Sequence, residues 1–196
     1  MSDTEMVFWN RYGLISYLGK RLGKGSLRKT AIQKLVYLIQ EVLNVPLGYK
    51  FDLYHYGPYS QDLAGDVDIV KNLNGIEIAY DPVLNLYNIS PGVNSDTLIK
   101  KGETFIKEYQ DKIESILSKF DAKRASELEL SATILYAWKD MQARSKALEK
   151  EVLEAVSALK PKLSDRDIAE SLRELKAMGY LSVSGATSCR SVLQTG

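Results

Sequence analysis

The stretch Leu27–Leu43 constrains the fold of this chain more strongly than any other part of the sequence. Its apolar residues recur at helical spacing and cover more than one stripe of the predicted helix; they are Leu27, Ala31, Ile32, Leu35, Val36, Leu38, Ile39, Val42 and Leu43. A helix that is apolar over so much of its surface usually lies at the centre of a core. Ser26 is suited to cap its start, and Asn44 and Pro46 are suited to end it. We therefore expect the other elements to pack around this helix.

The residues on either side of this helix predict a small module of helices and a hairpin. The expected elements are a helix at Met6–Leu22, an extended segment at Tyr49–His55, a helix at Gln61–Leu73, and a hairpin of Ile76–Tyr80 with Asn85–Ile89. Gly57-Pro58 is expected to form a turn, and Ser60 to cap the helix that follows it. Three helices followed by a hairpin is the order of a winged-helix domain. Residues 1–92 are therefore predicted to form a winged-helix-like module.

The rest of the chain predicts a second, helical region at residues 93–183. Helices are expected at Thr97–Phe120, Glu127–Met141, Lys146–Leu159 and Asp165–Met178, because apolar residues recur there at intervals of three and four. Ser164 is suited to cap the last helix and Gly179 to end it. A short strand is expected at Tyr180–Val183, and the region is compatible with a second winged-helix-like unit. Residues 184–196 predict a disordered tail, and the predicted fold class is mainly α with a small β-hairpin.

Composition excludes several classes of protein. The single cysteine, Cys189, allows neither an internal disulfide nor a cysteine-based zinc site, which favours a reducing compartment. No stretch approaches the roughly 20 apolar residues of a membrane span, and the start of the chain lacks the basic region of a secretory signal. A cytoplasmic protein with no membrane partner is therefore expected. The formal net charge of +1 argues against binding to nucleic acid or membranes through bulk electrostatics.

The residues that could carry catalysis or hold a metal form no recognisable constellation. The single histidine, His55, precedes Ser60 and Asp62, but Ser60 lacks the flanking glycines of a nucleophile elbow. We expect His55 to be a partly buried ring packed among tyrosines, with Ser60 as a helix cap. Asp66 and Asp68 add two further acids, fewer oxygen ligands than hard cations need, so a solvated acidic face is favoured. No catalytic residue, metal or cofactor is predicted.

A basic run is the candidate site for nucleic acid. It contains Lys20, Arg21, Lys24, Arg28, Lys29 and Lys34, with no acid between them. These side chains could hold phosphates, or they could be solvated and pair with acids elsewhere in the chain. The third helix of a winged helix normally enters the major groove. In the predicted helix Gln61–Leu73 three aspartates oppose one lysine, which disfavours that use.

An aromatic cluster is the candidate site for a protein partner. It contains Tyr49, Phe51, Tyr54, Tyr56 and Tyr59, and His55 lies among them. Tyrosine is favoured at interfaces because it combines an apolar ring with a polar hydroxyl. The same residues could instead pack a turn against the central helix. The sequence leaves both interpretations open.

Several segments together resemble a known family. The run QKLVY, then GYKF and YHYGPYS, and later ELSATILYAW and ALKPKLSDRDIAESLRELKAMGYL, cover most of Thr30–Leu181. They are similar to the YwgA-like proteins of bacteria and archaea, a resemblance that implies no reaction and carries over no catalytic residue. More remotely, the region resembles the Panacea domain of SocA-type antitoxins. Those proteins hold or neutralise toxins, or act as proteolytic adaptors, through protein contacts, so this resemblance implies a partner protein.

The sequence therefore predicts a non-enzymatic regulatory or adaptor protein that binds another protein through the surface Tyr49–Ser60. A winged-helix transcriptional regulator that binds DNA is the alternative. A homodimer is compatible with either function. An enzyme of unrecognised type ranks last, because the usual nucleophile, base and metal constellations are missing.

Overall fold

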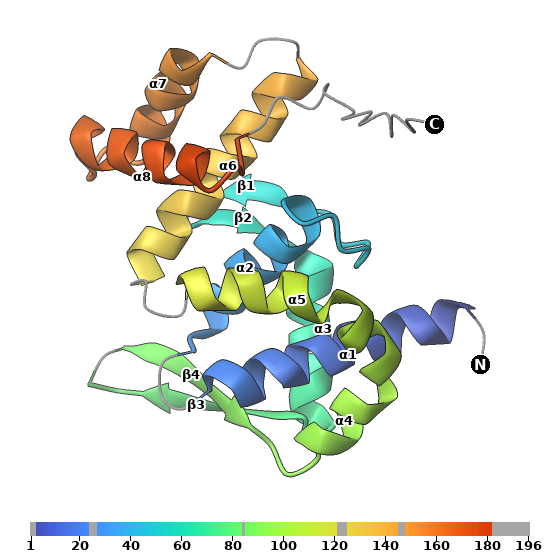
Figure 1. Cartoon of the computed structure of the whole chain (residues 1–196). Helices are drawn as coiled ribbons and strands as arrows, with labels where there is room; N and C mark the ends of the chain where they lie inside the picture. The colour runs from blue at the N-terminus through green and yellow to red at the C-terminus, as the bar shows by residue number, and fades with distance from the viewer. Residues whose placement is uncertain (1–2, 24–26, 84, 121–124, 145–147, 182–196) are drawn as a thin grey trace, which may run out of the picture. The chain divides into compact units, whose positions relative to one another are not determined.

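The computed structural model describes residues 3–23, 27–83, 85–120, 125–144 and 148–181. Within these ranges the chain forms eight helices and two antiparallel hairpins, which confirms the predicted mainly α fold class (Figure 1). It divides into two compact units, Met1–Tyr136 and Ala137–Gly196. The predicted tail, residues 184–196, lies outside the described residues.

The first unit contains most of the elements. Its helices are α1 (Asp3–Leu22), α2 (Lys29–Glu41), α3 (Gln61–Asn72), α4 (Ser95–Lys101), α5 (Glu103–Phe120) and the first part of α6 (Ala125–Ala143). Its strands are β1 (Asp52–Tyr54), β2 (Gly57–Tyr59), β3 (Ile76–Asp81) and β4 (Leu86–Pro91). The predicted hairpin is β3–β4, in which Ile76 pairs with Pro91 and Asp81 with Leu86. The hairpin β1–β2 was not predicted.

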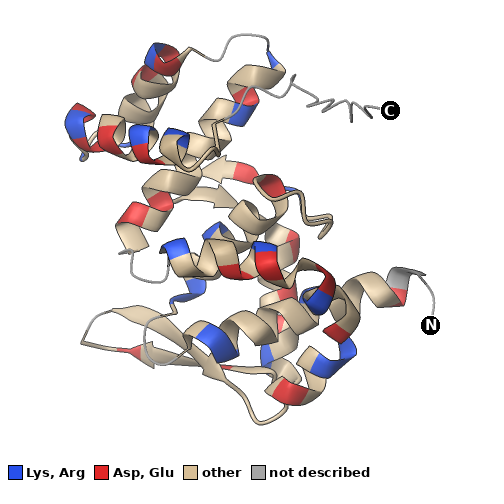
Figure 2. Cartoon of the chain, in the orientation of Figure 1, with Lys and Arg blue, Asp and Glu red and all other residues tan. Residues whose placement is uncertain are grey.

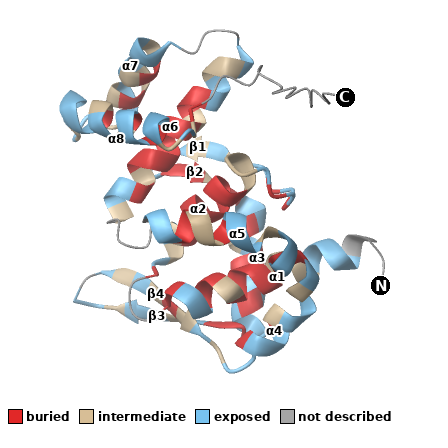
Figure 3. Cartoon of the chain, viewed as in Figure 1, coloured by how far each residue is buried: buried red, intermediate tan, exposed pale blue. Residues whose placement is uncertain are grey.

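Helix α2 lies at the centre of the first unit, as its apolar pattern predicts. The buried residues of α2 are Ile32, Gln33, Lys34, Leu35, Val36, Tyr37, Leu38 and Ile39, which leaves little of its middle exposed (Figure 3). Helix α1 adds Leu14, Ile15 and Leu18 to the core. The two buried polar residues of α2, Gln33 and Lys34, are unusual in such a helix, because a buried polar group must be hydrogen-bonded to avoid a large free-energy cost.

The elements of the first unit follow the order expected of a winged helix, with one insertion. The segment between α1 and α2 pairs with β4: the Ile89 amide donates to the Leu27 carbonyl at 2.7 Å, and Arg28 forms a β-bridge with Asn88. Helix α3 then precedes the hairpin β3–β4. The inserted element is the hairpin β1–β2, between α2 and α3.

The predicted single helix Thr97–Phe120 is wrong, because the chain breaks at Gly102 into α4 and α5. Helix α1 passes so close to this break that a Cβ on Gly102 would lie 2.8 Å from the Trp9 carbonyl oxygen. The apolar spacing continues across the break, so the sequence pattern does not reveal it. Helices α4 and α5 pack against α1. The predicted domain boundary at residue 92 therefore falls inside the first unit.

The second unit contains the end of α6, with α7 (Glu149–Leu159) and α8 (Asp165–Ala177). Helices α7 and α8 pack against each other. Ser164 caps α8 as predicted, since its hydroxyl accepts from the Asp167 amide at 3.2 Å. Gly179 follows the helix with φ of +77°. The predicted strand Tyr180–Val183 is not formed in its described part, because Tyr180 and Leu181 lie in a turn.

Candidate functional site: a tyrosine-lined groove across α2

The hairpin β1–β2 places three of the predicted contact residues around its tip. Leu53 pairs with Pro58 and Tyr54 with Gly57, so His55 and Tyr56 form the two-residue turn. The predicted turn at Gly57-Pro58 is therefore wrong by two residues, and these residues begin β2 instead. Gly57 has φ of +84°, and a Cβ there would lie 2.8 Å from the Thr133 hydroxyl of α6. Glycine is needed at this position for both reasons.

Two glutamines of α2 fix the two ends of the segment that carries this hairpin. The Gln40 side-chain amide donates to the Tyr49 carbonyl and accepts from the Tyr49 amide, both at 2.8 Å. The Gln33 amide makes the same pair of bonds with Ser60, at 3.0 and 2.8 Å. Next to Gln33, the Lys34 ammonium donates to the Pro58 carbonyl at 2.9 Å. These bonds explain the buried polar residues of α2, and they hold the hairpin rigidly against the helix.

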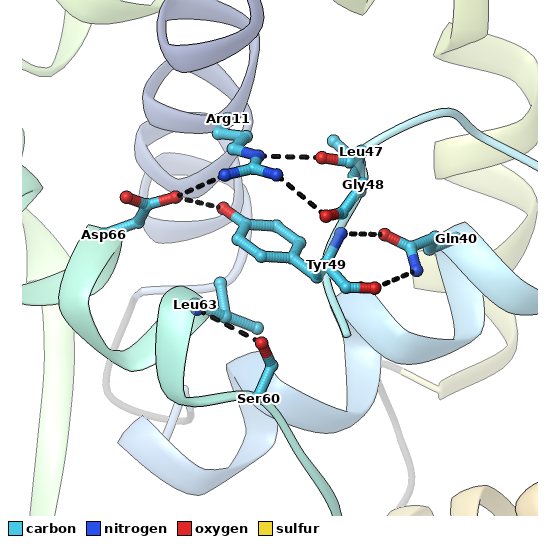
Figure 4. A network of polar contacts seen from close by, with 8 residues as sticks. All are labelled: Arg11, Gln40, Leu47, Gly48, Tyr49, Ser60, Leu63 and Asp66. Carbon is cyan, nitrogen blue, oxygen red and sulfur yellow. Dashed lines mark hydrogen bonds and ion pairs between the residues drawn. The ribbon is translucent and has the colours of Figure 1, made fainter. Parts of the chain in front are cut away.

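A second buried network ties the start of this segment to α1 and α3 (Figure 4). Arg11 of α1 donates to the carbonyls of Leu47 and Gly48, at 2.7 and 3.0 Å. Its guanidinium lies 4.3 Å from the centre of the Tyr49 ring and 3.7 Å from the Asp66 carboxylate of α3. The Tyr49 hydroxyl donates to the same carboxylate at 2.8 Å. Three elements that are distant in sequence therefore meet at one carboxyl group.

The two acidic groups of this network both titrate above their ordinary range. Burial raises the pKa of Asp66, while the Tyr49 hydrogen bond and Arg11 lower it in part. Burial also raises the pKa of Tyr49, and the neighbouring Asp66 charge raises it further. The Tyr49 hydroxyl therefore stays protonated at neutral pH and acts as a hydrogen-bond donor.

Above this framework lies a groove that we call the tyrosine groove. Its larger cavity, of about 520 Å³, is bounded by α2, α3, the hairpin β1–β2 and strand β4, and four tyrosines line it: Tyr54, Tyr56, Tyr59 and Tyr87. A smaller cavity of about 310 Å³ adjoins it along α2 and reaches the start of α6. Thr30, Lys34 and Tyr56 line both cavities, so the groove continues from one into the other.

The predicted contact residues divide between core and surface. Tyr49 is 4% exposed, so its assignment to a contact surface is corrected to the core. Phe51 is half-buried against the ring of Tyr37, at 5.2 Å between ring centres. Tyr54 and Tyr56 are 58% and 70% exposed, and Tyr59 is half-buried beside Tyr54. His55 is exposed at the hairpin tip, so the expectation of a partly buried ring is wrong.

The described residues of the basic run do not form one open positive face. Lys20 pairs with Asp96, Arg21 with Glu114 at 3.3 Å and Lys29 with Asp68 at 2.8 Å. Lys34 is 4% exposed and bound to the hairpin, so its assignment as a phosphate contact is corrected. Arg28 is exposed, and Lys24 lies outside the described residues.

The predicted acidic face of α3 is also corrected, because Asp66 is buried while Asp62 and Asp68 are exposed. Ser60 caps α3 as predicted, with its hydroxyl accepting from the Leu63 amide at 3.3 Å. Within the described ranges, no group of three or more metal-binding side chains comes together. In the same part of the chain, no helix combines the length and apolar character needed to cross a bilayer.

Sequence reasoning missed the residues that build the groove. Gln33 and Gln40 lie seven residues apart in a helix with a broad apolar surface, so they share a face. That spacing was the available signal, since a polar residue in a buried stripe needs a partner. Tyr87 and Arg11 carried no local signal, because their roles depend on elements distant in sequence.

Comparisons with known proteins do not supply a family for this chain: no protein-family model matches it, and no curated protein matches it.

Proposed function

We propose that this chain is a non-enzymatic regulatory or adaptor protein that holds a segment of a partner protein in the tyrosine groove. The observation that carries the proposal is the pair Tyr54 and Tyr56, which stand exposed beside a cavity of about 520 Å³. A large exposed aromatic surface next to a concavity is the usual form of a binding site. Tyrosine is also enriched among the residues that dominate binding energy at protein interfaces.

The rigidity of the groove supports this use. Gln33 and Lys34 fix the β2 side of the hairpin to α2 through buried hydrogen bonds. Gly57 brings the hairpin close to Thr133 of α6. A partner that enters a surface already held in place loses less conformational entropy on the protein side, which strengthens binding.

The polar residues near the groove support a non-enzymatic role. The Ser60 hydroxyl is used as a helix cap, and the Asp66 carboxylate is used to bind Tyr49 and Arg11. A hydrolytic site needs a nucleophile within hydrogen-bond reach of a base that a third group orients. Ser60 and Asp66 are engaged in holding the fold, so we assign them structural roles.

Site-specific photo-crosslinking tests the proposal. A benzophenone amino acid replaces Tyr56 in the full-length chain, and cells that express it are irradiated. We expect a discrete adduct between this chain and another polypeptide. The matched control carries the same group at Val93, which is 85% exposed and outside the groove. Adducts of equal yield from both positions, or none from position 56, would contradict the proposal.

The DNA-binding alternative rests on the winged-helix-like order of elements, to which the pairing of the Leu27–Arg28 segment with β4 belongs. This order says nothing of the ligand. The pairing of Lys20, Arg21 and Lys29 with acids, and the burial of Lys34, weigh against it.

A further inference from the structure

Helix α3 has a glycine beside the tyrosine groove that the packing of the chain does not require. Gly65 lies in the middle of α3 and lines the larger cavity. A Cβ added there would meet no atom within 4 Å, and Gly65 does not have a left-handed φ. Glycine weakens a helix relative to alanine, so nothing within the free chain favours it here. The missing side chain leaves room for another backbone to pass close to α3.

The two cavities of the groove differ in chemistry. The larger one is lined by four tyrosines with Ala64 and Val67, besides polar side chains such as Gln33 and Gln61, and its tyrosines suit a bulky apolar side chain. The smaller one combines Ala31 and Ala125 with the polar side chains of Arg28, Ser126 and Glu129. Tyr56 borders both cavities. A ligand that crosses Tyr56 therefore needs an apolar part at one end and a polar part at the other.

The charged residues along the groove indicate whether the polar group of the ligand is acidic or basic. Lys29 and Asp68 pair with each other at 2.8 Å, and Lys34 and Glu129 each have a partner within the chain. Arg28 is exposed in the smaller cavity and forms no ion pair with any described residue. A guanidinium binds a carboxylate through two parallel hydrogen bonds, which is its strongest ordinary pairing.

We propose that the tyrosine groove binds a peptide segment of the partner that places a large apolar side chain among the tyrosines and an acidic side chain against Arg28. The backbone of this segment passes over Gly65. This inference rests on the proposed function and specifies the chemistry of its partner. In this arrangement Tyr56 and the neighbouring tyrosines bind the apolar side chain, Arg28 binds the acidic side chain, and the peptide backbone lies close to Gly65.

A displayed library of random 12-residue peptides, selected on the full-length chain, tests the inference. We expect the enriched peptides to share an aromatic or large aliphatic residue near an Asp or Glu. Representative peptides are then synthesised with a fluorescent label, and their affinities are measured by anisotropy. The variants are Gly65→Leu, which fills the path over α3, and Arg28→Glu, which reverses the selected charge. Lys71→Ala, on α3 but outside the groove, is the control.

We expect Gly65→Leu to weaken binding at least about tenfold while its thermal midpoint stays equal or rises, which excludes misfolding as the cause. Selection on Arg28→Glu should enrich Lys and Arg in place of the acids. Lys71→Ala should bind as the unmodified chain does. Equal affinity for Gly65→Leu, or an unchanged peptide preference with Arg28→Glu, would overturn the inference.

Failure of this inference is distinguishable from failure of the proposed function. If photo-crosslinking from position 56 captures a protein but selection enriches no apolar–acidic peptides, the proposed function stands and the inference is wrong. If neither experiment gives a groove-dependent result, both are wrong.

Discussion

Tyr49 and Asp66 are joined by a buried hydrogen bond, and Arg11 of α1 forms an ion pair with the same Asp66 carboxylate (Figure 4). We predict that Tyr49→Phe lowers the free energy of unfolding by about 1.5–3 kcal/mol, because a hydrogen bond to a buried charged group is lost. Urea denaturation at neutral pH measures this change. Tyr54→Phe removes the same atom from an exposed ring and should change stability by less than about 0.5 kcal/mol.

A double-mutant cycle with Asp66→Ala checks that the effect belongs to this pair. We expect the two changes together to cost less than the sum of the single changes, by about 0.5–3 kcal/mol. Additive costs would show that the two side chains stabilise the fold independently of each other.

Asp66 also predicts a pH dependence. Because burial raises its pKa in the folded state, the stability linked to this group is present at acid pH and is lost as pH rises through the raised value. We therefore expect the unmodified chain to gain stability relative to Asp66→Asn as pH falls from 7 toward the ordinary value of 3.8. The other carboxyl groups titrate in both proteins and largely cancel in the difference.

Unfolding free energies of the two proteins at pH 7 and at about pH 4.5 make this comparison. A difference that moves the other way would show that Arg11 and Tyr49 outweigh burial and lower the pKa of Asp66.

At the scale of elements, substitutions at two glycines are expected to have opposite effects on stability. Gly102→Ala would place a Cβ 2.8 Å from the Trp9 carbonyl oxygen, where α1 crosses the break between α4 and α5. We expect it to destabilise the chain by about 1–3 kcal/mol, because backbone must shift to admit the methyl group. Gly65→Ala meets no atom within 4 Å and should stabilise it by about 0.4–1 kcal/mol. Thermal melts of both variants test the contrast, and two shifts of the same sign would contradict it.

The elements that the sequence predicts well are those with a strong local signal. Helix α2 follows from its apolar pattern, the hairpin β3–β4 from alternation on both sides of a turn, and the start of α8 from the Ser164 cap. The break at Gly102 has no such signal, because the glycine is required by α1, about ninety residues earlier in the chain. A local sequence pattern cannot show that a distant helix leaves no room for a side chain at a given position.

The candidate site was predicted in part for the same reason. The segment Tyr49–Ser60 carries the hairpin β1–β2, and its Tyr54 and Tyr56 lie on the surface, which a contact site requires. The burial of Tyr49 was not predictable, because Arg11 and Asp66 create its environment from two other helices. The hairpin was missed because Gly57-Pro58 has the composition of a turn. Proline lacks a backbone N–H, but it can occupy a strand position where no N–H is needed for pairing, as Pro58 does in β2.

At the scale of the whole molecule, the distribution of charge bears on whether the ligand is a protein or a nucleic acid. The formal net charge is +1, and acids and bases alternate along helices such as α5 and α8 (Figure 2). Three cations of the basic run are paired with acids, and Lys34 is buried. Nonspecific DNA affinity grows with the number of phosphates that a protein neutralises, and so does its dependence on salt.

We therefore predict that the full-length chain at about 50 µM does not bind a mixed-sequence duplex at physiological ionic strength, where nonspecific binders show dissociation constants of about 1–100 µM. Fluorescence anisotropy of a labelled duplex provides the measurement. The charge-reversed variant Lys20→Glu/Arg21→Glu should match the unmodified chain in this assay, because both side chains already face acids. Binding that strengthens steeply as salt is lowered, and that this variant abolishes, would contradict the prediction and make DNA the ligand to pursue. Binding that the variant leaves intact would instead place the phosphate contacts elsewhere, and Arg28 would be the next side chain to reverse, because it is exposed and unpaired among the described residues.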